Sequence, residues 1–212
     1  MFKKDLRIEA RTKELVATAG FFAVLVCVLS SIAFLADDTT APGAVWLPVA
    51  FACVLGLSRS WQREREDGAL TALLLAPIPR AAIFAGKALG IFAFLLVVMG
   101  LLVPTVGLLF HLDLGGKLGG LALLCILGAL GAAGIGTLFG VMTVRTRARD
   151  LLLSVILLPM LAPVLLTGIS GTHAALGGAS LGELQDYFLL LLTFDFLAVG
   201  GGLALFGFLV DE

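Results

Sequence analysis

The sequence predicts an all-α integral membrane protein with six transmembrane helices, and three observations carry that prediction. First, 60% of the 212 residues are hydrophobic and only 14% are charged, whereas a soluble domain carries about 25% charged residues. Second, apolar runs of about 18 residues or more recur along the chain, and each is long enough to cross a bilayer as a helix. Third, the basic residues gather in alternate connections between these runs. We therefore expect one transmembrane domain over residues 1–212, embedded in a lipid bilayer.

The N-terminal stretch MFKKDLRIEARTKE is too polar to span a membrane. On a helix, Phe2, Leu6 and Ala10 share one face, which predicts a short amphipathic helix lying on the cytoplasmic leaflet. A plain basic tail that only sets orientation is the alternative. The first span is expected at 15–36. It is not interpreted as a signal peptide, because its apolar run is too long for one and Phe34 stands where a cleavage site needs a small residue.

A short second span is expected at 42–57, and the densest charge run of the chain follows it. Residues 58–80 read SRSWQREREDGALTALLLAPIPR. Good helix formers fill this segment until Pro77 and Pro79, which end a helix. Opposite charges stand three or four residues apart, as in Arg63 and Asp67. The pattern predicts a second short amphipathic helix between spans two and three, over about 59–74, with a solvated loop anchored at the interface as the alternative.

Four further spans are expected at 81–110, 118–144, 150–170 and 187–210. Pro104, Pro159 and Pro163 lie inside them and should kink or break helices. Small residues let membrane helices approach closely. The sequence has Gly86–Gly90 and Gly136–Gly140 as GxxxG pairs, with Gly128, Gly131 and Gly134 nearby. These glycines fit either packing within the bundle or contact between two copies of the chain.

The distribution of Lys and Arg predicts the orientation of the spans. Thirteen of the 14 basic residues lie in three parts of the chain. These are the N-terminal tail, with Lys3, Lys4, Arg7, Arg11 and Lys13; the segment 58–87, with Arg59, Arg63, Arg65, Arg80 and Lys87; and the turn 145–149, with Arg145, Arg147 and Arg149. The opposite connections hold only Lys117. Because basic connections stay in the cytoplasm, we expect both termini there.

The run LGLSRSWQREREDGALTALLLAPIPRAAIFAGKAL at 55–89 resembles the signature region of the CcmB family. That family comprises heme exporter B subunits, the ABC transporter permeases of cytochrome c maturation. The stretches KKDLRIEARTKELVATAGFFAVLV, VRTRARDLLLSVILLPMLAPVLL and LLTFDFLAVGGGLALFGFLVDE are also similar to it. The resemblance implies an ABC-2-like permease and a function in heme export. REREDGALTALLLAP alone is also similar to other ABC-2 exporters, so a different substrate stays open, as does a non-transporting scaffold that couples ATP hydrolysis to release of a heme-bearing partner.

Partners follow from the same resemblance. The sequence contains no GxxxxGK[ST] phosphate-binding loop, so ATP would act only through a separate cytoplasmic ATPase. By resemblance, the helix between spans two and three would contact that ATPase, through Trp61, Arg63, Glu64, Arg65, Glu66 and Asp67. The basic turn with Arg145, Arg147 and Arg149 is a secondary candidate for this contact, and a positive-inside anchor with no further role is the alternative. A membrane heme-handling subunit is the other expected partner, a homodimer is left open, and no nucleic-acid partner is expected.

Few residues suggest chemistry of their own. Asp195 is an acid well inside a span, where acids are costly and usually face a bundle interior or a partner; a hydrogen-bonded structural acid near a leaflet boundary is the alternative. His111 and His173 are weak candidates for heme contact, since external loop histidines are more often simply solvated. The single cysteines Cys27, Cys53 and Cys125 show no metal-binding spacing. We expect no enzyme activity, no metal and no firmly bound cofactor, with heme as a transported or partner-bound ligand.

Overall fold

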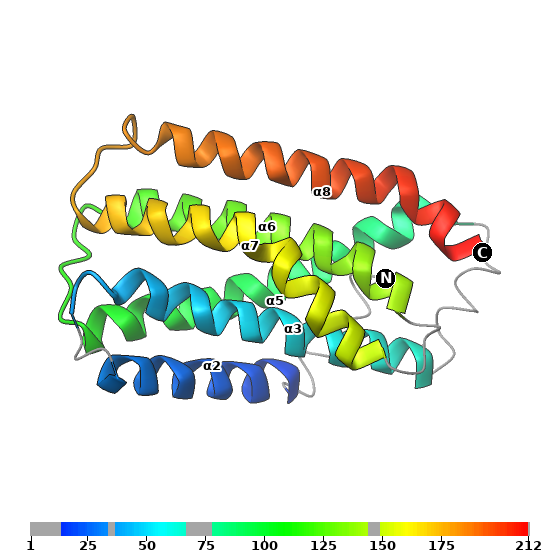
Figure 1. Ribbon diagram of the computed structural model, residues 1–212, viewed down its shortest axis with the longest axis horizontal. Coiled ribbons are helices and arrows are strands. Elements are labelled where there is room, and N and C mark those ends of the chain that lie inside the picture. Colours follow the sequence, from blue (N-terminus) through cyan, green and yellow to red (C-terminus); the bar gives the residue numbers. More distant parts are fainter. Residues whose placement is uncertain (1–13, 34–36, 67–77, 144–148, 212) are drawn as a thin grey trace.

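The computed structural model describes residues 14–33, 37–66, 78–143 and 149–211, and these form a bundle of six long helices (Figure 1). The helices are α2 (Glu14–Ala33), α3 (Ala41–Glu66), α5 (Arg80–Leu109), α6 (Leu118–Thr143), α7 (Arg149–Leu176) and α8 (Gln185–Asp211). Each contains a stretch that is long and apolar enough to cross a membrane. The prediction of an all-helical, six-span membrane protein is confirmed. The predicted N-terminal amphipathic helix lies outside the described residues.

Helix α3 differs from the expected boundary. A span at 42–57 was expected, followed by a separate amphipathic helix. Instead one continuous helix runs from Ala41 to Glu66, and its apolar part reaches Ser60. The reason is local: residues 58–66 change in polarity but contain no Gly or Pro that would end a helix. The charged run therefore begins as a direct extension of the second span, and the rest of the predicted helix, from residue 67, lies outside the described residues.

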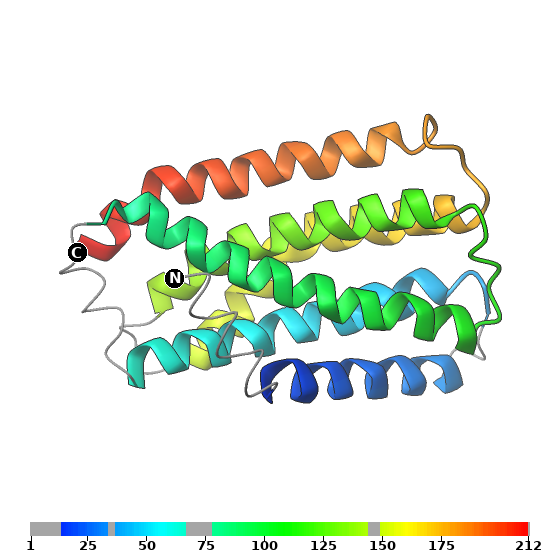
Figure 2. The same ribbon diagram turned by 180° about the vertical axis from the view of Figure 1, so that it is seen from behind.

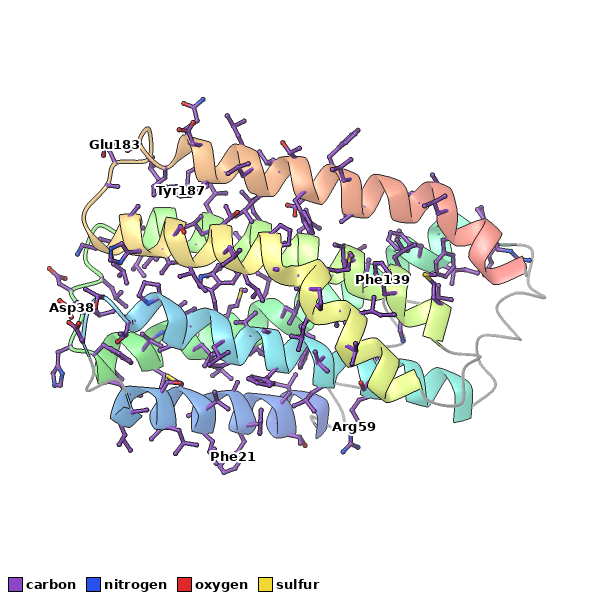
Figure 3. The ribbon with its side chains drawn as sticks, in the orientation of Figure 1. Phe21, Asp38, Arg59, Phe139, Glu183 and Tyr187 are labelled. Atoms are coloured by element: carbon purple, nitrogen blue, oxygen red, sulfur yellow. The ribbon has the colours of Figure 1, made fainter. Side chains whose placement is uncertain are left out.

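The helices alternate in direction, so the described connections fall at two ends of the bundle (Figures 1 and 2). One end holds the α5–α6 and α7–α8 connections and the turn before α3, with Asp37, Asp38, Asp113 and Glu183; we call it the acidic end. The other holds the first residues of α5 and α7 and the last residues of α3, α6 and α8; we call it the basic end. Figure 3 shows Asp38 and Glu183 at the acidic end and Arg59 toward the basic end.

Helix α6 lies at the centre of the bundle and packs against α3, α5, α7 and α8. Its glycines make these approaches close. A Cβ on Gly136 would lie 2.4 Å from Leu57 of α3, and one on Gly134 would lie 3.4 Å from the backbone of Ala198 in α8. Along this part of α6, the predicted glycine contacts are therefore within the bundle. Helices α2 and α8 lie at opposite edges (Figure 1), where large apolar side chains such as Phe21 and Phe196 are exposed, as lipid-facing residues would be.

The prolines bend one helix without interrupting it. Pro159 and Pro163 both lie inside α7, which remains a single helix of 28 residues. Figure 1 shows α7 changing direction near its middle. Proline removes a backbone donor and clashes with the preceding turn, which explains such a bend. Pro48 and Pro104 likewise lie inside α3 and α5.

Candidate functional site

Asp195 lies inside the bundle, near the middle of α8. Its side chain is only 4% exposed and faces Gly131 of α6, where a Cβ would come within 2.5 Å of the carboxylate Oδ1. Val164 of α7 borders the same point. The carboxylate thus occupies a junction of three helices, in space that a residue larger than glycine would fill.

Neither carboxylate oxygen of Asp195 makes a hydrogen bond within the described part of the chain. The Gly131 backbone is close to the carboxylate, so both a functional acid and a structural acid remain predictions. Burying a polar group without a partner is costly, and acids inside transmembrane segments usually mark sites of function. The arrangement offers one polar group, in an otherwise apolar junction, to a proton, a cation or a partner group.

Trp46 is a second buried feature, and the sequence did not point to it. It belongs to α3 and is 1% exposed. Its indole Nε1–H donates a hydrogen bond of 2.9 Å to the Thr172 Oγ1 of α7, and its ring lies against Gly128 of α6 and Gly168 of α7. Because these residues are far apart in sequence, no local pattern could have revealed their contact.

Lys87 ties α5 to α3 near the basic end. It is 2% exposed, and its Nζ donates a hydrogen bond of 3.2 Å to the backbone oxygen of Ser60. That oxygen lies where the apolar part of α3 ends. The distribution of basic residues in the sequence predicts only a cytoplasmic charge at this position. Its place in the apolar context AGKALG was the available signal, because a lysine among small residues is shielded from water once helices pack on it.

The predicted ATPase contacts fall at the basic end. Trp61, Arg63, Glu64, Arg65 and Glu66 occupy the last residues of α3; the positions of their side chains lie outside the described part. Asp67, Arg145 and Arg147 are outside the described residues, and Arg149 is the first residue of α7. The structure thus places the first five predicted contacts on one rigid helical extension.

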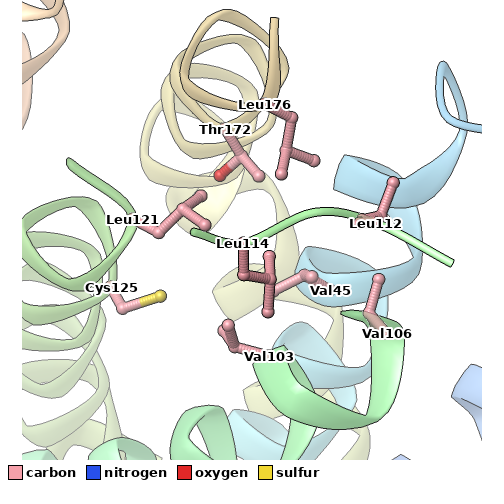
Figure 4. A pocket seen from close by; sticks show the side chains of 9 residues that line it. All are labelled: Val45, Val103, Val106, Leu112, Leu114, Leu121, Cys125, Thr172 and Leu176. Atoms are coloured by element: carbon pink, nitrogen blue, oxygen red, sulfur yellow. The ribbon is translucent and has the colours of Figure 1, made fainter. Parts of the chain in front are cut away.

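The acidic end contains a small apolar cavity (Figure 4). Its volume is about 10 Å³, and it is lined by Val45, Val103, Val106, Leu112, Leu114, Leu121, Cys125, Thr172 and Leu176. A space of this size holds about one water molecule. The cavity lies beside Trp46, since Val45 precedes that residue and Thr172 is its hydrogen-bond partner. It cannot hold a tetrapyrrole.

The two histidines are exposed at the acidic end. His111 has φ +53° and follows the C-terminus of α5, where the Leu112 N–H donates a 2.9 Å hydrogen bond to the Gly107 oxygen. This is the pattern of a Schellman cap, whose left-handed residue is usually glycine. His173 lies in the last turn of α7. Within the described residues, no group of three His, Cys, Asp or Glu side chains could hold a metal ion.

Two capping arrangements at the acidic end were also not predicted. The Lys117 Nζ donates a 2.7 Å hydrogen bond to the last backbone oxygen of α7, that of Leu176. Before α8, the Ser180 N–H and Oγ–H both donate to Glu183 Oε2, at 2.7 and 2.9 Å. These donors hold the pKa of the Glu183 carboxyl below its ordinary value. The spacing S-x-x-E was the available signal, since it is that of a capping box.

Comparison with known proteins gives the family. The model of the family described as "CcmB protein" matches residues 1–208. Heme exporter protein B of Paracoccus denitrificans is 32% identical over 187 residues, which cover 83% of this chain and 82% of the relative. The proteins of the same name from Bradyrhizobium diazoefficiens and Escherichia coli K12 are 27% and 28% identical, over 84% and 82% of this chain and 82% and 81% of theirs. The six-helix chain therefore belongs to the CcmB protein family.

Proposed function

We propose that the chain is the membrane permease subunit of a bacterial ABC transporter that exports heme for the biogenesis of c-type cytochromes. The observation that carries this proposal is the similarity, over four fifths of the chain, to relatives named heme exporter protein B. The all-helical bundle with six apolar spans fits a permease. An ABC-2 exporter of another substrate is the less favoured alternative, because the relatives' names specify heme.

Energy would come from a separate cytoplasmic ATPase. The chain has no phosphate-binding loop, and positive-inside orientation would put the basic end in the cytoplasm of the inner-membrane protein. There α3 continues to Glu66 as one helix beyond the apolar part that ends at Ser60. A charged, rigid extension of a membrane helix is well suited to docking, because mixed charges set the register of a contact. Arg149, with Arg145 and Arg147, would supply the secondary contact.

Heme would be cargo shared with a membrane heme-handling subunit rather than a resident cofactor. A second candidate function is a scaffold that couples ATP hydrolysis to the release of heme from that partner, and the small size of the described cavity at the acidic end, about 10 Å³, agrees with it. In this function, heme would not pass between α3, α5, α6 and α7. His111 and His173 lie at the acidic end, where either function would place the outgoing heme.

Purification of the complex tests the proposal. We expect the tagged chain to bring down an ABC ATPase and a membrane subunit, and the complex to show the Soret absorbance of heme. ATP should then lower the heme content, whereas a non-hydrolysable analogue should not. Recovery of the chain with an ATPase but without heme under any nucleotide condition would contradict the assignment and favour export of another substrate.

Heme-loaded complex in sealed vesicles separates export from scaffolding. If the chain exports heme, ATP should move heme across the vesicle membrane. If it is a scaffold, ATP should release heme from the partner without any transfer across the bilayer.

A further inference from the structure

Trp46 joins three helices in the half of the bundle nearer the acidic end. It comes from α3, its indole N–H donates to Thr172 of α7 at 2.9 Å, and both residues are almost completely buried. A hydrogen bond from the ring nitrogen fixes the plane and direction of the indole. It does so between helices whose partner residues are 126 positions apart.

The indole also fills space that two glycines leave open. A Cβ on Gly128 of α6 would lie 2.4 Å from Trp46 Cη2, and one on Gly168 of α7 would lie 2.5 Å from Cε2 and Cζ2. Real Cβ atoms essentially never come within 3.0 Å of a heavy atom of a neighbouring side chain. The ring is therefore inserted between two helix backbones. Gly168 and Thr172 are four residues apart, so they lie on the same face of α7.

This geometry restricts how α3 can move. If α3 slid by one helical turn, about 5.4 Å, the ring would leave its slot and meet side chains on α6 and α7. Packed interfaces of this kind change between discrete arrangements rather than deforming continuously. Near the acidic end, α3, α6 and α7 are therefore expected to move together.

Farther toward the basic end, α3 is also closely packed, through other residues that contact α5 and α6. Leu57 of α3 meets Gly136 of α6 through flexible methyl groups. Helix α7 contains Pro159 and Pro163 before it reaches Gly168. Trp46 contacts α7 at Gly168 and Thr172, which lie beyond these prolines. The bend therefore separates the half of α7 that contacts the indole from the half toward the basic end.

We propose that Trp46 is the positioning residue through which movement of α3, applied at its basic end, is transmitted to α6 and α7 at the acidic end. This inference rests on the proposed function, because the ATPase supplies the movement. Helix α3 carries the predicted docking extension at one end and, at the other, the Trp46 indole with its contacts to Gly128, Gly168 and Thr172, which we call the indole joint. The helix is continuous between them, with Pro48 two residues after Trp46. The joint lets a cytoplasmic displacement change the external end of the bundle.

Four variants and one control test the joint. Gly168→Ala forces a methyl group against the indole, and Trp46→Leu empties the slot. The double variant Trp46→Leu, Gly168→Ala removes the clash, because the added methyl group enters space that the smaller side chain leaves. Thr172→Val is a milder variant that keeps the side-chain shape and removes the hydrogen-bond acceptor. Gly43→Ala is the control: it lies on α3, and a Cβ there would meet nothing within 4 Å.

The measurement is heme delivered per ATP hydrolysed by the assembled complex, or heme released in the scaffold mode. We expect the ratio to fall about fivefold or more in Gly168→Ala and Trp46→Leu, a fall typical of a lost coupling. It should fall less in Thr172→Val, and it should stay low in the double variant, which lacks the indole and its hydrogen bond. Gly43→Ala should match the unmodified chain.

A purely structural role would instead lower the amount of assembled complex and leave the ratio unchanged, which would overturn the inference. Thermal unfolding of the isolated chain supplies a separate readout that needs neither heme nor ATPase. There the double variant should be no less stable than the worse single variant. If the double variant regains the ratio without the indole, Trp46 does not transmit movement. If the unmodified complex hydrolyses ATP without moving or releasing heme, the proposed function fails instead, and the unfolding data still report whether the joint exists.

Discussion

Asp195 and Lys87 are both residues of charged types that the bundle buries, yet their surroundings differ. The Lys87 ammonium reaches the backbone oxygen of Ser60 at 3.2 Å, so its burial strengthens a contact between α5 and α3. The Asp195 oxygens have no hydrogen-bond partner in the described chain. A buried polar group that packing alone does not explain is a candidate for function. At the scale of single residues, Asp195 is therefore the side chain whose chemistry most needs an experiment.

Changing Asp195 to Asn should separate function from packing. Asparagine has nearly the same shape but cannot ionise, so the junction with Gly131 should remain filled. We expect cytochrome c maturation to fall on the order of tenfold or more, which corresponds to about 1.4 kcal/mol or more, while the amount of chain in the membrane stays normal. Thr193→Val is the matched control, because Thr193 is exposed on the same helix and its Oγ–H donates a 2.8 Å hydrogen bond to the Leu189 carbonyl within that helix. Full activity of Asp195→Asn would leave the acid a structural role only.

At the scale of helices, existence was predictable from the sequence, and boundaries and contacts were less so. Apolar length identified all six helices, because a bilayer demands about 20 apolar residues per span. The continuity of α3 to Glu66 was missed because the change in polarity after Leu57 suggested a break where the backbone has none. The left-handed conformation of His111 could not be predicted, because the left-handed position of a Schellman cap is normally occupied by glycine.

Contacts between helices could not be predicted from the sequence, for a different reason. The Trp46–Thr172 hydrogen bond and the insertion of the indole between Gly128 and Gly168 depend on how α3, α6 and α7 are placed against each other. An apolar sequence says little about such placement, because most faces of its helices look alike. Glycine positions in α6 predicted close approach correctly, but the identity of each partner required the fold.

The capping box before α8 yields a prediction with a pH dependence. Donors from Ser180 hold the pKa of Glu183 below its ordinary value, so the ionised carboxylate stabilises the folded turn. That stabilisation is fully present above the unfolded-state pKa and is lost as the pH falls through the folded-state pKa. We expect Glu183→Ala to lower the melting temperature slightly at neutral pH.

The difference from the unmodified chain should then shrink in acid. Thermal unfolding in detergent, at neutral pH and at a pH below the ordinary range of glutamate, checks this. A melting difference that is the same at both pH values would show that the carboxylate charge has no part in the cap.

The whole molecule is oriented by the distribution of its basic residues. The described Lys and Arg residues other than Lys117 lie toward the basic end, with Arg59 as an example in Figure 3, whereas acidic residues lie at both ends; this bias of Lys and Arg is what the positive-inside rule orients. Reporter fusions after Thr40, Gly68 and Gly178 should therefore report outside, inside and outside. Any other order would place the α3 extension on the wrong side of the membrane for a cytoplasmic ATPase.

The last prediction concerns the assembly that this orientation permits. If the basic end of α3 docks on the ATPase, reversing Glu64 and Glu66 to Lys should weaken co-purification of the ATPase. Losing one partner of a buried charged pair costs about 2–5 kcal/mol, whereas charges at the rim of an interface change affinity little. The loss should thus be large if these carboxylates are desolvated on docking, and adding Trp61→Ala should increase it.

Reversing Glu9 and Glu14 to Lys is the matched control, since both precede the first apolar span and the change in net charge is the same. This control should keep the ATPase bound, because added positive charge on that side agrees with the orientation and leaves the α3 extension intact. Normal ATPase recovery from the variant that combines Glu64→Lys, Glu66→Lys and Trp61→Ala would contradict the docking assignment. The extension of α3 would then hold the helix at the membrane surface and nothing more, because a rigid helix transmits force only through an end that is engaged.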